Sequence, residues 1–221
     1  MELPRQVGLM ILPSVNLFPQ AVLPLFIFEP RYRRMLADSL ASHRLFCVAM
    51  LKPGASRETP APVAGLGVIR AAVENPDGTS HLILQGLSRV QLGRVARYRP
   101  YRVHSIRQLA PSRQDGTEID ALAAKVRELV GRRFQQGLPV PLQFLQKSGM
   151  SGSGVSVGQI LESLEEIEDA GTLADLVSCT LLPDAGQRQI MLETVEIEAR
   201  LRHLIFFLLA EIRRAQADMA D

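Results

Sequence analysis

Hydrophobic residues in the first half of the chain recur at the short spacing that is typical of β-strands. Apolar or alternating runs are separated by Pro, Gly, Asn and Asp, which favour turns. The predicted strands cover residues 7–12, 22–28, 45–51, 63–73, 81–85, 89–95 and 101–108. The segment Asn75-Pro76-Asp77-Gly78 lies between two of these runs and has the residues of a tight turn. We therefore expect a β-hairpin at this point.

One predicted helix interrupts the strands, and it begins at Pro30. Proline has no N–H and fits the first turn of a helix. Glu29 precedes it, where a carboxylate can accept from free backbone N–H groups and is favoured by the helix dipole. An apolar stripe follows at helical spacing: Tyr32, Met35, Leu36 and Leu40. The pattern predicts a strand-to-helix corner in which Tyr32 anchors the helix.

After residue 110 the hydrophobic period lengthens to that of amphipathic helices. Helices are predicted over residues 119–134, 157–167 and 196–215, with further helices between the last two. The residues expected as N-caps are Thr117, Ser156, Thr172 and Asp184. We therefore predict an α+β fold with two domains, a β-rich domain over residues 1–112 and an α-helical bundle over residues 113–221.

The charge distribution supports this division. The formal net charge of the 221-residue chain is +2. Residues 1–110 contain 14 basic and 6 acidic residues, whereas residues 111–221 contain 11 and 17. The halves therefore carry net charges of +8 and −6. This asymmetry indicates two different surfaces, and it makes nucleic acid a candidate partner for the first half. Hydrophobic residues form 47% of the chain, which excludes a disordered protein.

Cysteine usage and the apolar runs indicate a cytoplasmic protein. Cys47 and Cys179 each lie in an apolar run, so we interpret both as small buried hydrophobic residues in a reducing compartment. The N-terminal sequence lacks the features of a signal peptide. The longest apolar run near the end, residues 204–210, is much shorter than the roughly 20 residues of a membrane span.

The motifs of enzymes are weak or absent in this sequence. "GVSVG", residues 154–158, matches the G-x-S-x-G pattern, and His203 follows in hydrolase order. A nucleophile elbow requires a buried strand before the serine, whereas Ser156 follows a polar, glycine-rich stretch, so we interpret it as an N-cap. The four histidines show no metal-ligand spacing, and no P-loop motif occurs. No catalytic residue, cofactor or metal is predicted.

Two segments are candidates for binding other molecules. The first is rich in arginine and is interleaved with Tyr98 and Tyr101. Its candidate contacts to single-stranded RNA are Arg94, Arg97, Arg99 and Arg102. The alternative is a solvated strand face, on which arginine stems cover apolar surface. The second segment, "RHLIFFLLAEI", is apolar on almost every side of a helix, which leaves Phe206 or Phe207 for a central core position or for a contact with another chain.

Several stretches, in order along the chain, resemble one family. "LPLFIFEPRYRRML", residues 23–36, resembles the opening signature of the Lon-protease N-terminal domain, also called the LON substrate-binding domain. "GLGVIRAAVENPDGTSHLILQGLSRVQL" is similar to its central strands, and "YRPYRVHSIRQL" to the next strand pair. "LADLVSCTLLPDAGQRQIMLETVEIEARLRHLIFFLLAEI" resembles its helical half. The resemblance extends over residues 3–213.

This resemblance implies a PUA-like β-rich domain followed by a helical bundle, and a unit that selects polypeptides without performing chemistry. The sequence contains neither the Walker motif of an ATPase nor paired zinc-binding cysteines. We therefore expect a stand-alone member without ATPase and protease domains, which binds unfolded or apolar polypeptide segments or a partner protein and can self-associate. RNA binding is the alternative.

The expected polypeptide or interface contacts are Phe18, Arg31, Tyr32, Phe206 and Phe207. Four aromatic residues lie near the family signature: Phe18, Phe26, Phe28 and Tyr32. We expect most of these four to belong to the core. Glu29-Pro30-Arg31-Tyr32 is therefore assigned an architectural role first.

Overall fold

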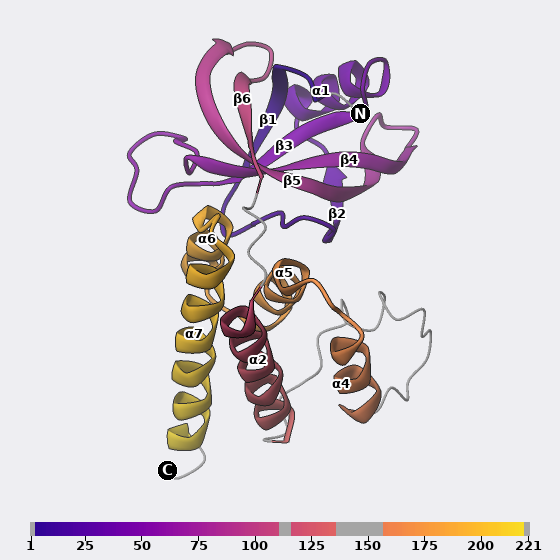
Figure 1. Cartoon of the computed structure of the whole chain (residues 1–221). Helices are drawn as coiled ribbons and strands as arrows, with labels where there is room; N and C mark the ends of the chain where they lie inside the picture. Colours follow the sequence, from indigo (N-terminus) through magenta and orange to yellow (C-terminus); the bar gives the residue numbers. More distant parts are fainter. Residues whose placement is uncertain (1–2, 111–115, 136–156, 219–221) are drawn as a thin grey trace. The chain divides into compact units, whose positions relative to one another are not determined.

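The chain folds into two compact units, residues 1–110 and 111–221 (Figure 1). The computed structural model describes residues 3–110, 116–135 and 157–218. Unit 1 comprises β1 (Gln6–Leu12), β2 (Val22–Ile27), α1 (Pro30–Leu40), β3 (Leu45–Met50), β4 (Val63–Glu74), β5 (Ser80–Arg97) and β6 (Val103–Leu109). The described elements of unit 2 are α2 (Thr117–Gln135), α4 (Val157–Glu165), α5 (Ala170–Leu181), α6 (Ala185–Glu193) and α7 (Ile197–Asp218). The predicted α+β class is confirmed.

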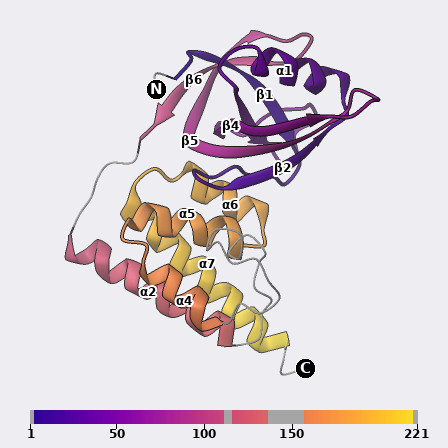
Figure 2. The same cartoon turned by 90° about the vertical axis from the view of Figure 1, so that its right-hand side faces the viewer.

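The sheet of unit 1 closes on itself. Its strand order is β2-β5-β4-β3-β1-β6, and β5 also pairs with β6. Five strands therefore form a ring, and β2 pairs with β5 outside that ring (Figure 2). All strand pairs are antiparallel except β1 with β3. Closure satisfies the backbone hydrogen bonds of strands that would otherwise form sheet edges.

The strand β5 corrects the sequence prediction, which divided it into residues 81–85 and 89–95. It is one strand of 18 residues that pairs with β2, β4 and β6. The glycine-containing stretch that suggested a break meets the backbone of a neighbouring segment: Gly86 donates to Ala21 O and accepts from Gln20 N–H. A Cβ at Gly86 would collide with the carbonyl oxygen of Phe18. Glycine therefore permits a close backbone approach here rather than ending the strand.

The predicted hairpin between β4 and β5 is confirmed. Gly78 has a φ of 77°, and its N–H donates to Asn75 O at 2.9 Å. The Asp77 carboxylate accepts from the Thr79 N–H at 2.9 Å. This turn sets the register that places Val73 opposite His81.

The corner at α1 is built mainly as predicted. Pro30 begins the helix, and Tyr32, Met35 and Leu36 are buried in a cluster with β-strand residues, whereas Leu40 is exposed. The Tyr32 hydroxyl accepts from the Ile11 N–H at 3.1 Å and lies 3.3 Å from Ile11 O, so it anchors the helix to β1. The expectation for Glu29 is wrong, because its side chain makes no cap hydrogen bond and instead accepts from Arg31 Nε at 2.8 Å.

Both faces of the β1 and β3 strands are buried. Leu9 and Cys47 belong to one apolar cluster, whereas Met10 and Phe46 belong to another. The sequences of these two strands are therefore continuous hydrophobic runs, without the alternation of a strand that is buried on one face only. Cys47 is fully buried, and burial raises the pKa of its thiol, in agreement with the structural role predicted for it.

In unit 2 the helix α2 lies beside α7, and α5 contacts both (Figures 1 and 2). Two N-caps differ from the predictions: α2 begins at Thr117 itself, and Asp169 rather than Thr172 caps α5 by accepting from the Thr172 N–H at 2.6 Å. The cap at Asp184 is confirmed, since its carboxylate accepts from the Gln187 N–H at 2.8 Å. Ser156 lies outside the described residues. Cys179 is half-buried rather than buried.

A buried ion pair joins α5 to α7. The Arg200 guanidinium donates from Nη1 to Asp175 Oδ1 at 3.1 Å, and both side chains are almost completely buried. Arg200 also donates to the carbonyl oxygens of Thr194 and Val195. The hydrogen-bonding capacity of this buried cation is thus directed at fixed acceptors on the segment that precedes α7.

Candidate functional site

One side of the neighbouring strands β2, β5 and β4 carries solvent-exposed apolar side chains. Because strand residues alternate between faces, Phe26 of β2, His81 of β5 and Val73 of β4 lie in one row across the three strands. Pro24, Ile83 and Ala71 form the adjacent row. Together these six residues are called the outer apolar face. They line a shallow cavity of about 420 Å³, with Leu25 and Leu82 also contributing.

The aromatic rings of this region gather at one end of β2. Phe26 is 49% exposed, Phe28 is 60% exposed and Val73 is 64% exposed. The Phe26 ring centroid lies 4.8 Å from that of His81 and 6.0 Å from that of Phe28. Contiguous exposed apolar residues mark interaction surfaces in soluble proteins, because water exposure of such area is unfavourable. Of the four aromatic residues near the family signature, most of which were expected in the core, Phe18 and Tyr32 are buried, whereas Phe26 and Phe28 are exposed.

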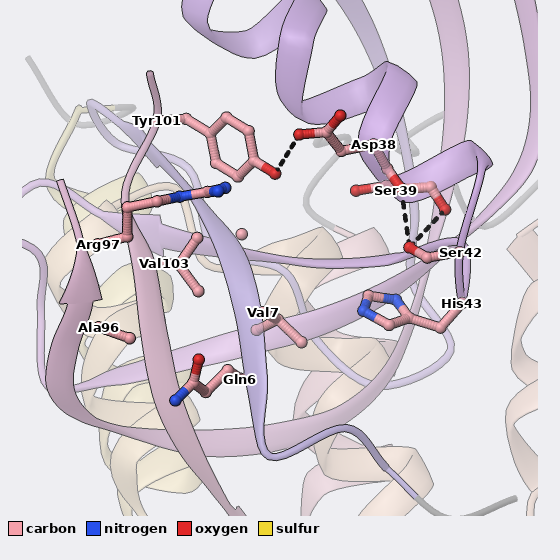
Figure 3. Close-up of a pocket in the computed structure, with 11 residues that line it drawn as sticks. Gln6, Val7, Asp38, Ser39, Ser42, His43, Ala96, Arg97, Tyr101 and Val103 are labelled. Carbon is pink, nitrogen blue, oxygen red and sulfur yellow. Dashed lines mark hydrogen bonds between the residues drawn. The ribbon is translucent and has the colours of Figure 1, made fainter. Parts of the chain in front are cut away.

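A polar cavity of about 390 Å³ lies at the C-terminal end of α1. Figure 3 shows the Tyr101 hydroxyl pointing toward Asp38, with Arg97 beside the tyrosine ring and His43 at the other end of the cavity. The hydroxyl donates to Asp38 Oδ2 at 2.7 Å, and the Arg97 guanidinium carbon lies 4.7 Å from the ring centroid. The floor includes Gln6 of β1.

The titratable groups of this polar cavity are engaged with neighbouring groups. The hydrogen bond from Tyr101 holds the pKa of Asp38 below its ordinary value, and burial together with that bond raises the pKa of Tyr101. Burial lowers the pKa of His43, whose Nδ1 accepts from the Leu45 N–H at 3.1 Å. His43 is thereby held as a neutral imidazole with Nε2 protonated. Its base nitrogen is occupied by the backbone, so it is not placed to activate a nucleophile.

A third cavity, of about 260 Å³, lies between the start of α1 and the β5–β6 loop. This cavity is called the arginine pocket; its charged lining residues are Arg31, Glu58, Arg99 and Arg102, and its aromatic lining residues are Tyr32, Tyr98 and Tyr101. Arg31 forms a bidentate ion pair with Glu58, in which Nη2 lies 2.8 Å from Oε1 and Nη1 donates to Oε2 at 2.9 Å. Arg102 Nη2 lies 3.3 Å from Oε2 of the same carboxylate. The hydrogen bond to Glu58 is the main cause that raises the pKa of Arg31.

The predicted polypeptide contacts are dispersed in the structure. Phe18 is fully buried and Tyr32 is buried, so neither belongs to an exposed surface. Arg31 lines the arginine pocket and lies over the Tyr32 ring, with its guanidinium carbon 4.5 Å from the centroid. In unit 2, Phe206 is 67% exposed and Phe207 is half-buried, and their ring centroids are 5.8 Å apart.

The arginines predicted as an RNA surface are also distributed over different environments. Arg94 is exposed on β5, Arg97 covers Tyr101 at the polar cavity, and Arg99 and Arg102 line the arginine pocket. Tyr101 is buried, and its hydroxyl is committed to Asp38. Of the two tyrosines in this segment, only Tyr98 is therefore exposed to stack on a base.

Sequence reasoning missed the outer apolar face and Glu58. The signal for the face was the strand period, which places Val22, Pro24 and Phe26 on one side of β2; in the structure these three are exposed, whereas Leu23 and Leu25 between them are half-buried. The role of Glu58 had no such signal. It belongs to the long connection between β3 and β4, and only the folded chain brings it to Arg31 and Arg102.

The described residues contain neither a cluster of metal ligands nor an assembled serine–histidine pair. No group of three or more His, Cys, Asp or Glu residues among them could hold a metal ion. His203 is exposed on α7, where its Nδ1 lies 3.3 Å from the Thr194 hydroxyl, and Ser156 is outside the described part of the chain. A search of the described helices found none with the length and apolar character of a membrane span.

Comparison with known proteins identifies the family that this chain matches. Residues 6–210 match the family described as the ATP-dependent protease La (LON) substrate-binding domain. The chain is 22% identical to the Lon protease of Dictyoglomus thermophilum over 214 residues, which is 96% of this chain and 25% of that protein. It is 27% identical to Lon protease 2 of Herpetosiphon aurantiacus over 208 residues, or 91% and 24%. The chain thus spans about a quarter of the length of these relatives.

Two solved structures share the fold. The N-terminal domain of the Mycobacterium avium complex Lon protease superposes with a TM-score of 0.67 at 20% identity, covering 92% of this chain and 97% of that one. The Lon N-terminal domain protein from Xanthomonas campestris gives a TM-score of 0.64 at 21% identity, covering 91% and 98%. At this level of identity the likeness concerns the fold.

Proposed function

Because the chain belongs to the LON substrate-binding domain family, we propose that it is a non-catalytic recognition module that binds exposed apolar segments of polypeptides. The binding surface in this proposal is the outer apolar face together with Phe28. Substrate recognition is the role that the family description gives, and the matched relatives are Lon proteases. The proposal includes the finer description of unit 1 as PUA-like and of unit 2 as a helical bundle.

The observation that carries the proposal is the exposure of aromatic and branched side chains on three neighbouring strands. An apolar partner that covers Phe26, Val73 and Ile83 would remove their apolar surface from water. This burial stabilises the complex by roughly 25 cal/mol for each Å² of apolar surface. Folded proteins hide their apolar segments, so such a face selects unfolded or partly unfolded chains.

The position of Pro24 indicates how a segment would bind. Among the described strands β2 pairs only with β5, and Pro24 lies opposite Ile83 in the middle of that pairing. Proline cannot donate to a strand that adds to the sheet, and edge prolines discourage such addition. Recognition in this proposal therefore uses side-chain contacts on the face rather than backbone pairing along β2.

The alternative of RNA binding has no support from the matched proteins. It also requires a continuous basic surface with several exposed aromatic rings. The structure offers Tyr98 alone as an exposed ring in the arginine-rich segment.

The proposal is tested by measuring the affinity of fluorescein-labelled, chemically unfolded casein for the purified chain and for Phe26→Gln and Phe28→Gln. Both side chains are exposed, so the variants should fold. We expect each variant to weaken binding by about tenfold, because hot-spot aromatic contacts contribute more than 1 kcal/mol. Binding should change little between low and high salt, since apolar contacts are not screened.

Phe206→Gln is the matched control, because it removes a phenylalanine of unit 2 that is at least as exposed as Phe26 and Phe28. Unchanged affinity in Phe206→Gln supports the outer apolar face as the site. A loss in Phe206→Gln without a loss in Phe26→Gln would transfer the site to α7. Absence of casein binding, combined with RNA binding that disappears at high salt, would refute polypeptide recognition and favour the arginine-rich segment.

A further inference from the structure

We propose that the arginine pocket binds a carboxylate side chain, Asp or Glu, of the recognised polypeptide through Arg99 and Arg102. This inference rests on the proposed function and adds a preference for segments that contain acidic as well as apolar residues. It assigns a role to a cavity that is separate from the outer apolar face, with no shared lining residue.

The pocket has more positive than negative charge. Three guanidinium groups line it, and Glu58 is the carboxylate in the lining. Glu29 also pairs with Arg31 from outside the lining, so three cations face two anions and the net charge is +1. The bidentate Arg31–Glu58 pair satisfies Arg31, whereas Arg102 is held at the longer distance of 3.3 Å. Arg102 therefore retains N–H donors for a second acceptor.

Arg99 supplies the second cation. It is exposed at the rim, and within the described residues no carboxylate forms a salt bridge with it. Tyr98 precedes it and is also exposed. A guanidinium is suited to a carboxylate because its planar N–H groups match the two oxygens, and a partly enclosed site screens the attraction less than open water does.

The size and charge of the pocket favour a carboxylate over a nucleic-acid backbone. A volume of about 260 Å³ accommodates one side chain rather than a run of nucleotides. Glu58 would repel the successive phosphates of RNA, and one exposed tyrosine provides a single stacking platform. A lone carboxylate needs no stacking platform, and it meets the repulsion of Glu58 once rather than at each successive phosphate.

The inference is tested with two labelled peptides that share their apolar residues and length but carry either Glu or Gln. Fluorescence anisotropy at low salt should give about fivefold tighter binding of the Glu peptide, as expected for a charge-assisted hydrogen bond that is partly exposed. Raising the salt should reduce this preference. Arg99→Gln should abolish it and leave the melting temperature unchanged.

Arg94→Gln is the matched control, since Arg94 is exposed on β5 and does not line the pocket. Retention of the preference in this variant supports a local site. Equal affinities of the two peptides for the unmodified protein, or an equal loss in both arginine variants, would overturn the inference.

A second probe separates this inference from the proposed function. A peptide of Glu, Gly and Ser has no apolar residues, so it does not depend on the outer apolar face. We expect it to shift the NMR signals of the Arg99 and Arg102 Nε–H groups, even in Phe26→Gln. Shifts caused by an RNA oligonucleotide and not by the acidic peptide would refute carboxylate binding. Failure of casein binding with these shifts intact would refute only the apolar function.

Discussion

His104 is a buried, neutral imidazole whose protonation opposes folding. Its Nδ1 lies 3.2 Å from Gly93 O, and within the described structure its Nε2 has no hydrogen-bond partner. Burial lowers the pKa of His104, and the positive charge of Arg102 acts in the same direction. The unfolded chain therefore takes up a proton near the ordinary pKa of about 6.5, whereas the folded chain takes it up at a lower pH.

The free energy of unfolding should consequently fall as the pH decreases below about 6.5, by at most about 1.4 kcal/mol for each pH unit from this residue. Urea denaturation at several pH values between 7.5 and 5 measures the slope. His104→Asn keeps an N–H donor and should flatten the slope, although it also lowers stability at pH 7.5. Burial lowers the pKa of His43 too, so His43→Gln is measured in parallel. An unchanged slope in His104→Asn would contradict the assignment.

At the scale of the elements, Gly→Ala substitutions in β5 and α2 should change the stability of the protein in opposite directions. The Cβ of Ala at position 86 would overlap the carbonyl oxygen of Phe18, which is backbone and cannot rotate away. A Cβ at Gly131 in α2 would meet Leu161 methyl groups at 3.8 Å, an ordinary contact. Gly86→Ala should therefore destabilise the protein by about 1–3 kcal/mol.

Gly131→Ala should stabilise it by about 0.5–1 kcal/mol through helix propensity. Thermal denaturation of both variants checks these opposite signs. Equal shifts of the two melting temperatures would show that the close approach at Gly86 relaxes without cost.

Element positions were largely predictable, whereas the exposure of their faces was not. A continuous apolar run located β1, and turn residues and a proline located the hairpin at Gly78 and the start of α1, because these signals are local. The period of a strand places Phe26 on the same side as Pro24, but the sequence does not tell which side of β2 lacks a covering layer. The division of β5 failed for a related reason, since the need for Gly86 arises from the Phe18 segment, which is distant in sequence.

At the scale of the whole molecule, the resemblance of several stretches predicted the family to which the chain belongs, whereas the pockets could not be predicted from the sequence. The arginine pocket combines residues of α1, the β3–β4 connection and the β5–β6 loop. Its key carboxylate, Glu58, has no sequence feature that distinguishes it from a solvated residue. Only the closure of the sheet brings these segments together, and closure depends on pairings between β1, β5 and β6.

We expect the two units to lose structure separately, because the apolar clusters given by the strands and α1 are complete within unit 1. Arg200→Leu removes the buried partner of Asp175 and should destabilise unit 2 by about 3–5 kcal/mol. Hydrogen exchange should then accelerate in α5 and α7 while β3 and β4 remain protected, and casein binding should persist.

Arg213→Leu, an exposed substitution on the same helix, controls for the change of residue type. Simultaneous loss of protection in both units of Arg200→Leu would contradict independent unfolding. A loss of casein binding in this variant would show that recognition requires an intact unit 2. Persistence of casein binding would instead place recognition within residues 1–110, where the outer apolar face and the arginine pocket both lie. The acidic second half, with a net charge of −6, contributes no lining residue to either site, so its charge would then be available for another contact.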